Sequence, residues 1–240
     1  MKLFEWDAGA PYRVAFSTRV GGVSAGSFES LNLGILTADE PDNVVENRRR
    51  LCTAVGADPE SATMAWQVHG GRVSKADSRG IVTPGTVYER CDGLWTDSPG
   101  RALVLLTADC FPVALVRTSG PPSLAVLHVG WRGLLEGIAE EGVEALRGNG
   151  IVAAIGPGIG PCCYEVGDEV AEPYRERFGD EILTGRNLDL GLATERALLE
   201  AGCTTVERSG RCTSCEADLF FSHRRDHGRT GRQGVIAYIA

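Results

Sequence analysis

Apolar residues recur at helical spacing in three segments of the chain. Residues 41–56 carry an apolar stripe that also includes one charged residue, and its members are Val44, Arg48, Leu51 and Val55. Residues 131–146 carry a longer stripe that predicts a second helix. Residues 188–202 predict a third, with Asp189 as its N-cap and Gly202 just beyond its end.

Short runs rich in Val, Ile and Leu predict strands. They are Arg13–Ser17, Met64–Val68, Ala102–Thr107, Val113–Arg117, Leu124–His128, Ile151–Ile155 and Val235–Ile239. Strands follow one another as well as alternating with helices, which favours an α+β fold with a mixed β-sheet flanked by helices. No repeat or linker divides the chain, so we expect a single domain over residues 1–240.

One predicted strand pair bears on chemistry. Val113–Arg117 and Leu124–His128 are separated by TSGPPS, a segment rich in turn formers. A hairpin centred on Gly120 and Pro121 would place His128 opposite a residue near the start of the first strand. Cys110 should then be a spatial neighbour of His128, although a bulge could shift the register by one residue.

Composition narrows the possible partners and the location. The net charge is −8, which disfavours non-specific binding to nucleic acid. The first residues lack the apolar core of a signal peptide, and no apolar run is long enough to span a membrane. We therefore expect a cytoplasmic protein whose eight cysteines are reduced thiols or metal ligands.

Three residues form a candidate metal site. The chain has only four histidines, and two of them, His69 and His128, stand beside glycine. With Cys110 they make a His/Cys/His set, which suits a catalytic zinc that keeps one open position. On spacing alone, a buried cysteine with two structural histidines is the more common arrangement.

The same residues also permit a different chemistry. Cys110 could be a nucleophile and His128 its general base, as in cysteine hydrolases. Such a pair needs an orienting Asn, Asp or backbone group, whereas the third residue here is a second imidazole, His69. That difference favours the metal site.

Six ordered blocks resemble the family known as multicopper polyphenol oxidoreductases or laccase-domain proteins, also called purine nucleoside phosphorylases or peptidoglycan editing factors. The blocks are residues 16–34, 66–73, 91–115, 125–138, 153–170 and 220–239. The resemblance implies that His69, Cys110 and His128 bind zinc, with copper possible in its place. It also implies an α+β fold related to that of cysteine-hydrolase toxins.

The histidine count excludes multicopper laccase chemistry. A trinuclear copper cluster alone needs about eight imidazoles, given the preference of copper for such ligands. This chain has four histidines, so it cannot build that site.

The resemblance implies instead a zinc-dependent purine nucleoside phosphorylase that acts on adenosine, inosine, guanosine and methylthioadenosine plus phosphate, with adenosine deaminase activity. Arg19, Arg132 and Arg232 each stand near glycine and are the candidates for binding phosphate. Asp92 and Asp109, together with Arg132, are the catalytic candidates. Either carboxylate could transfer protons or support a zinc-bound histidine.

Two alternatives to the phosphorylase remain. One is a hydrolase, either an editor of peptidoglycan precursors or a Cys-His enzyme using Cys110 and His128. The other is a non-catalytic zinc-binding protein that interacts with partners. The sequence leaves the oligomeric state undetermined.

A second cysteine motif lies near the C-terminus. Cys212 and Cys215 form a CxxC that is followed by His223 and His227. This is a weaker candidate for a second, structural zinc, because the gap between the cysteines and the histidines is shorter than in common zinc fingers. The pair Cys162–Cys163 is interpreted as packing.

Overall fold

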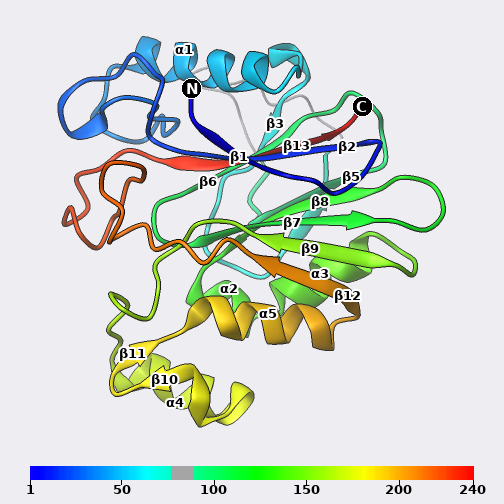
Figure 1. The fold of residues 1–240 in the computed structure, drawn as a ribbon, viewed down its shortest axis with the longest axis vertical. Helices are drawn as coiled ribbons and strands as arrows, with labels where there is room; N and C mark the ends of the chain where they lie inside the picture. Colours follow the sequence, from blue (N-terminus) through cyan, green and yellow to red (C-terminus); the bar gives the residue numbers. More distant parts are fainter. Residues whose placement is uncertain (77–88) are drawn as a thin grey trace.

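The computed structural model describes residues 1–76 and 89–240, whose longer strands form two sheets (Figure 1). The first sheet has the order β1-β2-β13-β6-β3. Its strands are β1 (Leu3–Trp6), β2 (Tyr12–Ser17), β13 (Gln233–Ile239), β6 (Leu103–Thr107) and β3 (Thr63–Met64). All of its pairs are antiparallel except β3 with β6.

The second sheet has the order β12-β9-β7-β8-β5-β4. Its strands are β12 (Cys203–Arg208), β9 (Ile151–Ile155), β7 (Phe111–Arg117), β8 (Leu124–Val129), β5 (Gly93–Thr96) and β4 (Val73–Lys75). The outer pairs β12/β9 and β4/β5 are parallel and the central pairs antiparallel. The predicted α+β fold with mixed strand directions is confirmed, but in two sheets rather than one. The likeness to cysteine-hydrolase toxins stays a prediction.

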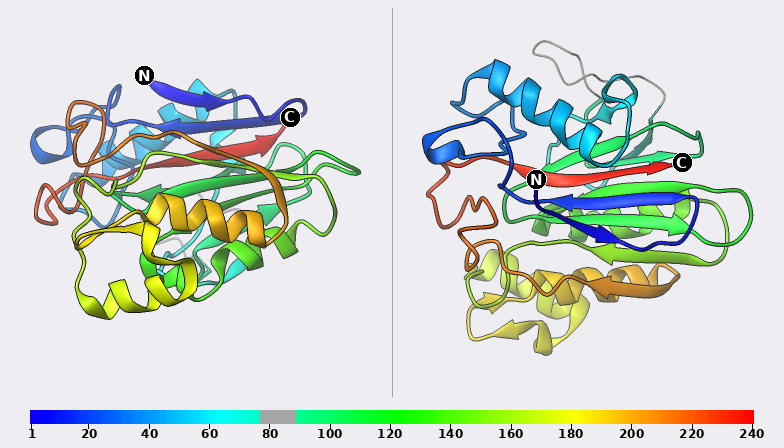
Figure 2. Two further views of the ribbon diagram at one scale, coloured as in Figure 1. Left: turned by 60° about the horizontal axis from the view of Figure 1, so that its bottom comes forward. Right: turned by 45° about the horizontal axis from the view of Figure 1, so that its top comes forward.

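Helices cover the outer faces of the two sheets (Figures 1 and 2). Helix α1 (Pro41–Ala54) packs on the first sheet. The helices on the second sheet are α2 (Trp131–Leu135), α3 (Ile138–Ala145), α4 (Asp168–Phe178) and α5 (Leu190–Glu200). Shorter elements are η1 (Gly26–Phe28), η2 (Pro59–Ser61), η3 (Asp180–Ile182), β10 (Leu183–Thr184) and β11 (Asn187–Leu188).

The side chains of β7 point alternately to the two faces of its sheet, so this strand contributes to two hydrophobic clusters. Val113 and Leu115 point into the cluster shared with the helices, whereas Ala114 and Val116 point into the cluster between the sheets. Successive side chains of a strand point to opposite faces, so a strand buried on both faces is apolar throughout. This is why the central strands are continuous apolar runs rather than alternating ones.

Two of the three predicted helices form as expected, and the third is divided. Asp189 caps α5 by accepting a hydrogen bond from the Leu192 amide at 2.8 Å. Residues 131–146 form two helices, α2 and α3, because Gly137 adopts a left-handed φ of 89° between them. Glycine tolerates that conformation at little steric cost. Helix α4 has no counterpart among the predicted helices.

The predicted strand Met64–Val68 is wrong beyond Met64. The side chain of Gln67 takes the place that a strand backbone would occupy. Its Nε2 donates to the Leu106 carbonyl at 2.6 Å, and its Oε1 accepts from the Leu106 amide at 2.9 Å. The backbone is therefore free to turn away from β6 toward residues 89–90.

The predicted hairpin is confirmed and positions the candidate site. Strands β7 and β8 pair with Pro112 opposite His128. Cys110 lies in the turn that carries the chain from β6, in the first sheet, to β7, in the second. The site therefore stands at the edge where the chain crosses between sheets. No helix in the described part of the chain is long and apolar enough to cross a membrane.

The packing predicts a large loss of stability when Leu127 is shortened. This residue of β8 is fully buried against α3. A Cβ atom added at Gly142 would lie only 2.8 Å from its Cδ1 atom, so the contact is tight. Leu127→Ala should lower the free energy of unfolding by about 2–5 kcal/mol in urea titrations, through lost burial and a cavity. Leu199→Ala, at a position 47% exposed, should change it by less than about 0.5 kcal/mol. Equal effects would contradict this packing.

Candidate metal centre

Three potential metal ligands converge at the end of the β7–β8 hairpin. One donor atom from each of His69, Cys110 and His128 lies within 4.8 Å of the other two. The two imidazole rings stand edge to face, with centroids 4.8 Å apart and an interplanar angle of 73°. His128 is buried, Cys110 is half-buried and His69 is exposed, so the group opens to one side.

Each ligand comes from a different local structure. His128 is in β8, Cys110 is in the turn between β6 and β7, and His69 is in the loop after β3. His69 has a φ of 62°, in the left-handed region that non-glycine residues seldom adopt. Gly130 permits the close approach, since a Cβ atom there would lie 3.1 Å from Cys110 Sγ and 3.4 Å from His69 Cδ2.

The buried carboxylate of Asp92 holds both histidines in place. It accepts hydrogen bonds from the amides of Val68, His69 and Gly70 at 3.1, 2.9 and 2.8 Å, which fixes the loop that carries His69. Its Oδ1 also lies 2.8 Å from His128 Nδ1. These contacts favour support of the histidines over proton transfer, the two roles left open by the sequence.

The contacts of Asp92 set its own charge and the tautomer of His128. Burial alone would raise the pKa of Asp92, but the hydrogen bonds from His128 and the loop amides hold it below its ordinary value. An ionised carboxylate only accepts hydrogen bonds, so His128 Nδ1 must carry a proton. His128 Nε2 is then the nitrogen available to a metal ion, as in carboxylate–histidine–zinc arrangements.

The charges of Cys110 and His128 stabilise each other. Burial alone would raise the pKa of Cys110, but the positive charge and hydrogen bond of His128, with a hydrogen bond from His69, lower it to about 6. Burial alone would lower the pKa of His128, but the charge of Cys110 and the bond to Asp92 raise it to about 9. The site thus favours a thiolate, the form that binds metals and attacks electrophiles.

The donor set fits zinc. A thiolate and two imidazoles match the ligand preference of zinc rather than that of magnesium or calcium. Their spacing lets three donors reach one ion through bonds of about 2.0–2.3 Å. All three residues line the cavity beside them, so an ion that they held would be accessible from that cavity.

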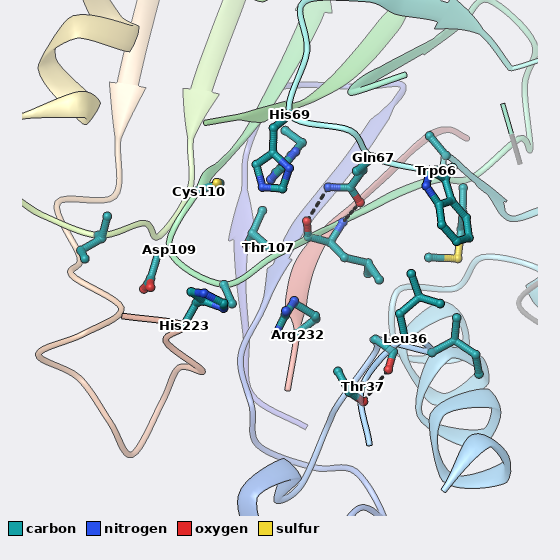
Figure 3. A pocket seen from close by; sticks show the side chains of 18 of the residues that line it. Leu36, Thr37, Trp66, Gln67, His69, Thr107, Asp109, Cys110, His223 and Arg232 are labelled. Carbon is teal, nitrogen blue, oxygen red and sulfur yellow. Dashed lines mark hydrogen bonds between the residues drawn. The ribbon is translucent and has the colours of Figure 1, made fainter. Parts of the chain in front are cut away.

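That cavity has a volume of about 530 Å³, in the usual range for small-molecule sites. Much of its wall is apolar, formed by Ile35, Leu36, Met64, Trp66, Leu106, Trp131 and Ile159. In Figure 3, Cys110 and Asp109 lie at one end of the view and Trp66 and Leu36 at the other. The three candidate ligands therefore line a largely apolar pocket.

Several polar residues of the cavity were not identified from the sequence. Arg48, His223, Arg224 and Thr107 line it together with the predicted Arg232. A signal existed for Arg48, because it is the one charged residue on the apolar stripe of α1, and its side chain is 3% exposed. No sequence pattern pointed to Arg224 or Thr107.

Two of the predicted phosphate-binding arginines lie outside the cavity lining. Arg19 donates to the carbonyls of Glu29 and Ala217 at 2.6 and 3.0 Å. Arg132 is exposed, and its guanidinium lies over the Trp131 ring. The structure therefore brings only Arg232, of the three, to the cavity.

Asp109 lines the cavity, but both oxygens of its carboxylate already accept hydrogen bonds from the protein. Oδ1 accepts a hydrogen bond from Thr213 Oγ1 at 2.7 Å, and Oδ2 accepts one from the Arg224 amide at 2.7 Å. Its own φ of 89° is left-handed. These contacts connect the turn that carries Cys110 to a C-terminal loop.

The second cysteine motif has different partners from those predicted. Cys212 and Cys215 group with Cys162 and Cys163, whereas His223 lines the cavity. The interpretation of Cys162–Cys163 as packing is wrong, because one of the two is exposed and the other half-buried.

Comparisons with known proteins identify the family. A family model described as multi-copper polyphenol oxidoreductase laccase matches residues 13–240. A protein named purine nucleoside phosphorylase YlmD, from Geobacillus stearothermophilus, is 41% identical and covers 93% of this chain and 88% of its own length. Another, named purine nucleoside phosphorylase YfiH, from Escherichia coli, is 35% identical, with coverages of 98% and 97%. The crystal structure of a Bacillus licheniformis hypothetical protein YfiH aligns with a TM-score of 0.93 at 34% identity, covering 99% of this chain and 96% of that one. By sequence and by fold, the chain belongs to the multi-copper polyphenol oxidoreductase laccase family.

Proposed function

We propose that this chain is a zinc-dependent purine nucleoside phosphorylase with adenosine deaminase activity. The observation that carries the proposal is the His69/Cys110/His128 group, which lines a cavity of about 530 Å³. Relatives named purine nucleoside phosphorylase, 41% and 35% identical over most of their length, support the substrate class. The four histidines remain too few for laccase chemistry.

His69, Cys110 and His128 would hold the zinc, with Asp92 orienting the two imidazoles. A zinc ion with an open position acts as a Lewis acid and lowers the pKa of water toward 7, which suits deamination of a purine. Copper could bind the same donors.

The cavity wall suits a purine nucleoside. Trp66 and Leu106 offer apolar surface for a flat base. Thr107 Oγ1 is buried in this wall and has no hydrogen-bond partner within residues 1–76 and 89–240. A buried hydroxyl without a partner is costly, so a small movement of the wall that exposes it to a ligand hydroxyl or ring nitrogen would be favoured.

Arg232 is the best placed of the predicted residues to bind phosphate. It lines the cavity, and burial lowers the pKa of its guanidinium, partly offset by the charges of Asp109 and Cys110. Its NH1 atom donates to the Thr230 and Gly231 carbonyls at 3.0 and 2.8 Å, which fixes the side chain. A guanidinium held in this way can present its remaining donors to a phosphate dianion.

A cysteine hydrolase is the second candidate, and one observation favours it. Asp92, His128 and Cys110 form a connected series in which the carboxylate orients the imidazole, as a nucleophilic site requires. Asp92 is therefore the orienting residue that a Cys-His nucleophile requires. Peptidoglycan-precursor editing would use the same pocket.

We propose a cytoplasmic location. All eight cysteines lie in the described part of the chain, and none forms a disulfide. Free thiols in this number suit a reducing compartment.

Removing one ligand should release the metal from this centre. Cys110→Ala should lose one equivalent of zinc per chain relative to wild type, by elemental analysis after desalting, because two imidazoles alone bind weakly. Cys52→Ala, at a buried thiol in the α1 core, should lose none. Unchanged zinc in the Cys110 variant would refute the ligand assignment.

Phosphate should be a true co-substrate. Hypoxanthine release from inosine should depend on phosphate, and Arg232→Gln should raise the KM for phosphate about 10- to 100-fold, since a charged hydrogen bond contributes about 1.5–3 kcal/mol. Arg132→Gln is the matched control, because Arg132 is exposed and outside the cavity lining. An unchanged rate after rigorous removal of phosphate would identify a hydrolase instead.

Alkylation should separate the metal ligand from the nucleophile. With zinc bound, iodoacetamide should modify Cys110 slowly. After chelation the alkylation rate should rise as the pH increases through about 6 and then level off. The reason is that the pKa of Cys110 is lowered to about 6, so the reactive thiolate predominates above that pH. Peptide mapping measures this against Cys203, whose burial raises its pKa to about 12 and which should stay unmodified. Fast alkylation before chelation, with activity unchanged by the chelator, would favour the hydrolase.

A further inference from the structure

Four cysteines that the proposed function does not use meet near the surface. The Sγ atoms of Cys162, Cys163, Cys212 and Cys215 all lie within 4.8 Å of one another. Cys215 Sγ is 3.4 Å from both Cys162 Sγ and Cys163 Sγ, although Cys162 and Cys215 are 53 residues apart in sequence. Of the other four cysteines, three are buried in the core and one is Cys110. Every cysteine with appreciable exposure outside the candidate metal centre therefore belongs to this cluster.

We propose that these four cysteines bind a structural zinc ion, separate from the candidate metal centre. Zinc bound to four thiolates is tetrahedral, with Zn–S bonds of about 2.3 Å that place the sulfurs about 3.8 Å apart. The cluster's sulfurs are already near that spacing, at 3.4 Å for two pairs and within 4.8 Å for all. Four protein ligands leave no open position, so the ion stabilises the structure rather than taking part in catalysis.

Other uses of the cluster fit less well. A disulfide joins two sulfurs at about 2.05 Å and would leave two thiols of the cluster unused. Cys215 is equally close to Cys162 and Cys163, so the arrangement does not single out one pair. A polynuclear iron–sulfur cluster places several irons and sulfides between its cysteines and needs them farther apart. Calcium and magnesium prefer oxygen ligands.

The residues around the four sulfurs favour metal binding. The Gly160 amide donates to Cys212 Sγ at 3.2 Å, a contact that orients and stabilises a thiolate. A Cβ atom at position 160 would lie 3.4 Å from Cys162 Sγ and 3.3 Å from Cys212 Cβ, so the glycine makes room for both. Cys162 and Cys215 are exposed and the other two half-buried, which gives an ion a path from solvent.

The ion would join two loops that line the cavity. The Thr213 amide donates to the Gly158 carbonyl at 3.0 Å, so the loops are already paired beside the cluster. From one loop, Tyr164 lines the cavity next to Cys163. From the other, the Thr213 hydroxyl binds the Asp109 carboxylate at 2.7 Å. Zinc at the cluster would thus fix the wall of the cavity and the turn that carries Cys110.

The test measures the zinc content of variants that each remove a ligand from only one of the two proposed zinc sites. Each protein is purified with a thiol reductant and desalted. The wild type should hold two zinc ions per chain, Cys215→Ala and Cys110→Ala one each, and the double variant none. Cys215 is exposed, so alanine there should remove a ligand without disturbing the core. Zinc-edge X-ray absorption of Cys110→Ala should show four sulfur neighbours at about 2.3 Å.

The control is Cys203→Ala, at a buried cysteine of β12 outside the cluster, which should keep both ions. Cys215→Ala with as much zinc as wild type would overturn the proposal. So would a Cys110→Ala spectrum that lacks sulfur neighbours, or a mass showing a disulfide within the cluster in protein kept reduced. Loss of zinc in Cys110→Ala tests the other centre, so failure of one assignment is distinguishable from failure of the other.

Discussion

The candidate site depends on one buried carboxylate. Asp92 is fully buried immediately before β5, and it accepts hydrogen bonds from three successive loop amides and contacts the imidazole of His128. These four donors offset the cost of burying its charge. One residue thereby sets the backbone of the loop that bears His69 and the tautomer of His128. Without it, two of the three candidate zinc ligands would lose their orientation, and the amides of the loop would lose their acceptor.

The same carboxylate makes the site suitable for two chemistries. A carboxylate that orients an imidazole beside a thiolate is the arrangement of a cysteine hydrolase as well as that of a supported metal ligand. What separates the two is His69, which brings a second imidazole within reach of Cys110 and His128. A nucleophilic site has no need of this second imidazole, whereas a zinc site uses it as a ligand. The apolar cavity and the arginines that line it then favour a nucleoside and phosphate as the substrates.

The cavity also depends on contacts between segments that are distant in sequence. The turn bearing Cys110 is held through Asp109 to the loop around Thr213, which pairs in turn with the loop that follows β9. The cysteine cluster lies where these two loops meet. A metal ion there would add a further restraint to these loops, much as a metal stabilises small domains that have little core. Two metal centres would then shape the cavity, the first by binding beside it and the second by stabilising its wall.

The sequence by itself determined the α+β class, the central strands, and the hairpin that brings Cys110 to His128. These follow from local periodicity and turn residues, which act within a few positions of the chain. It did not determine that Asp92 contacts both histidines, that Arg48 lines the cavity while Arg19 and Arg132 do not, or that two cysteine pairs about fifty residues apart form one cluster. Those features depend on side-chain direction and on the packing of loops against the sheets. No local pattern encodes such contacts, so only the tertiary structure decided them.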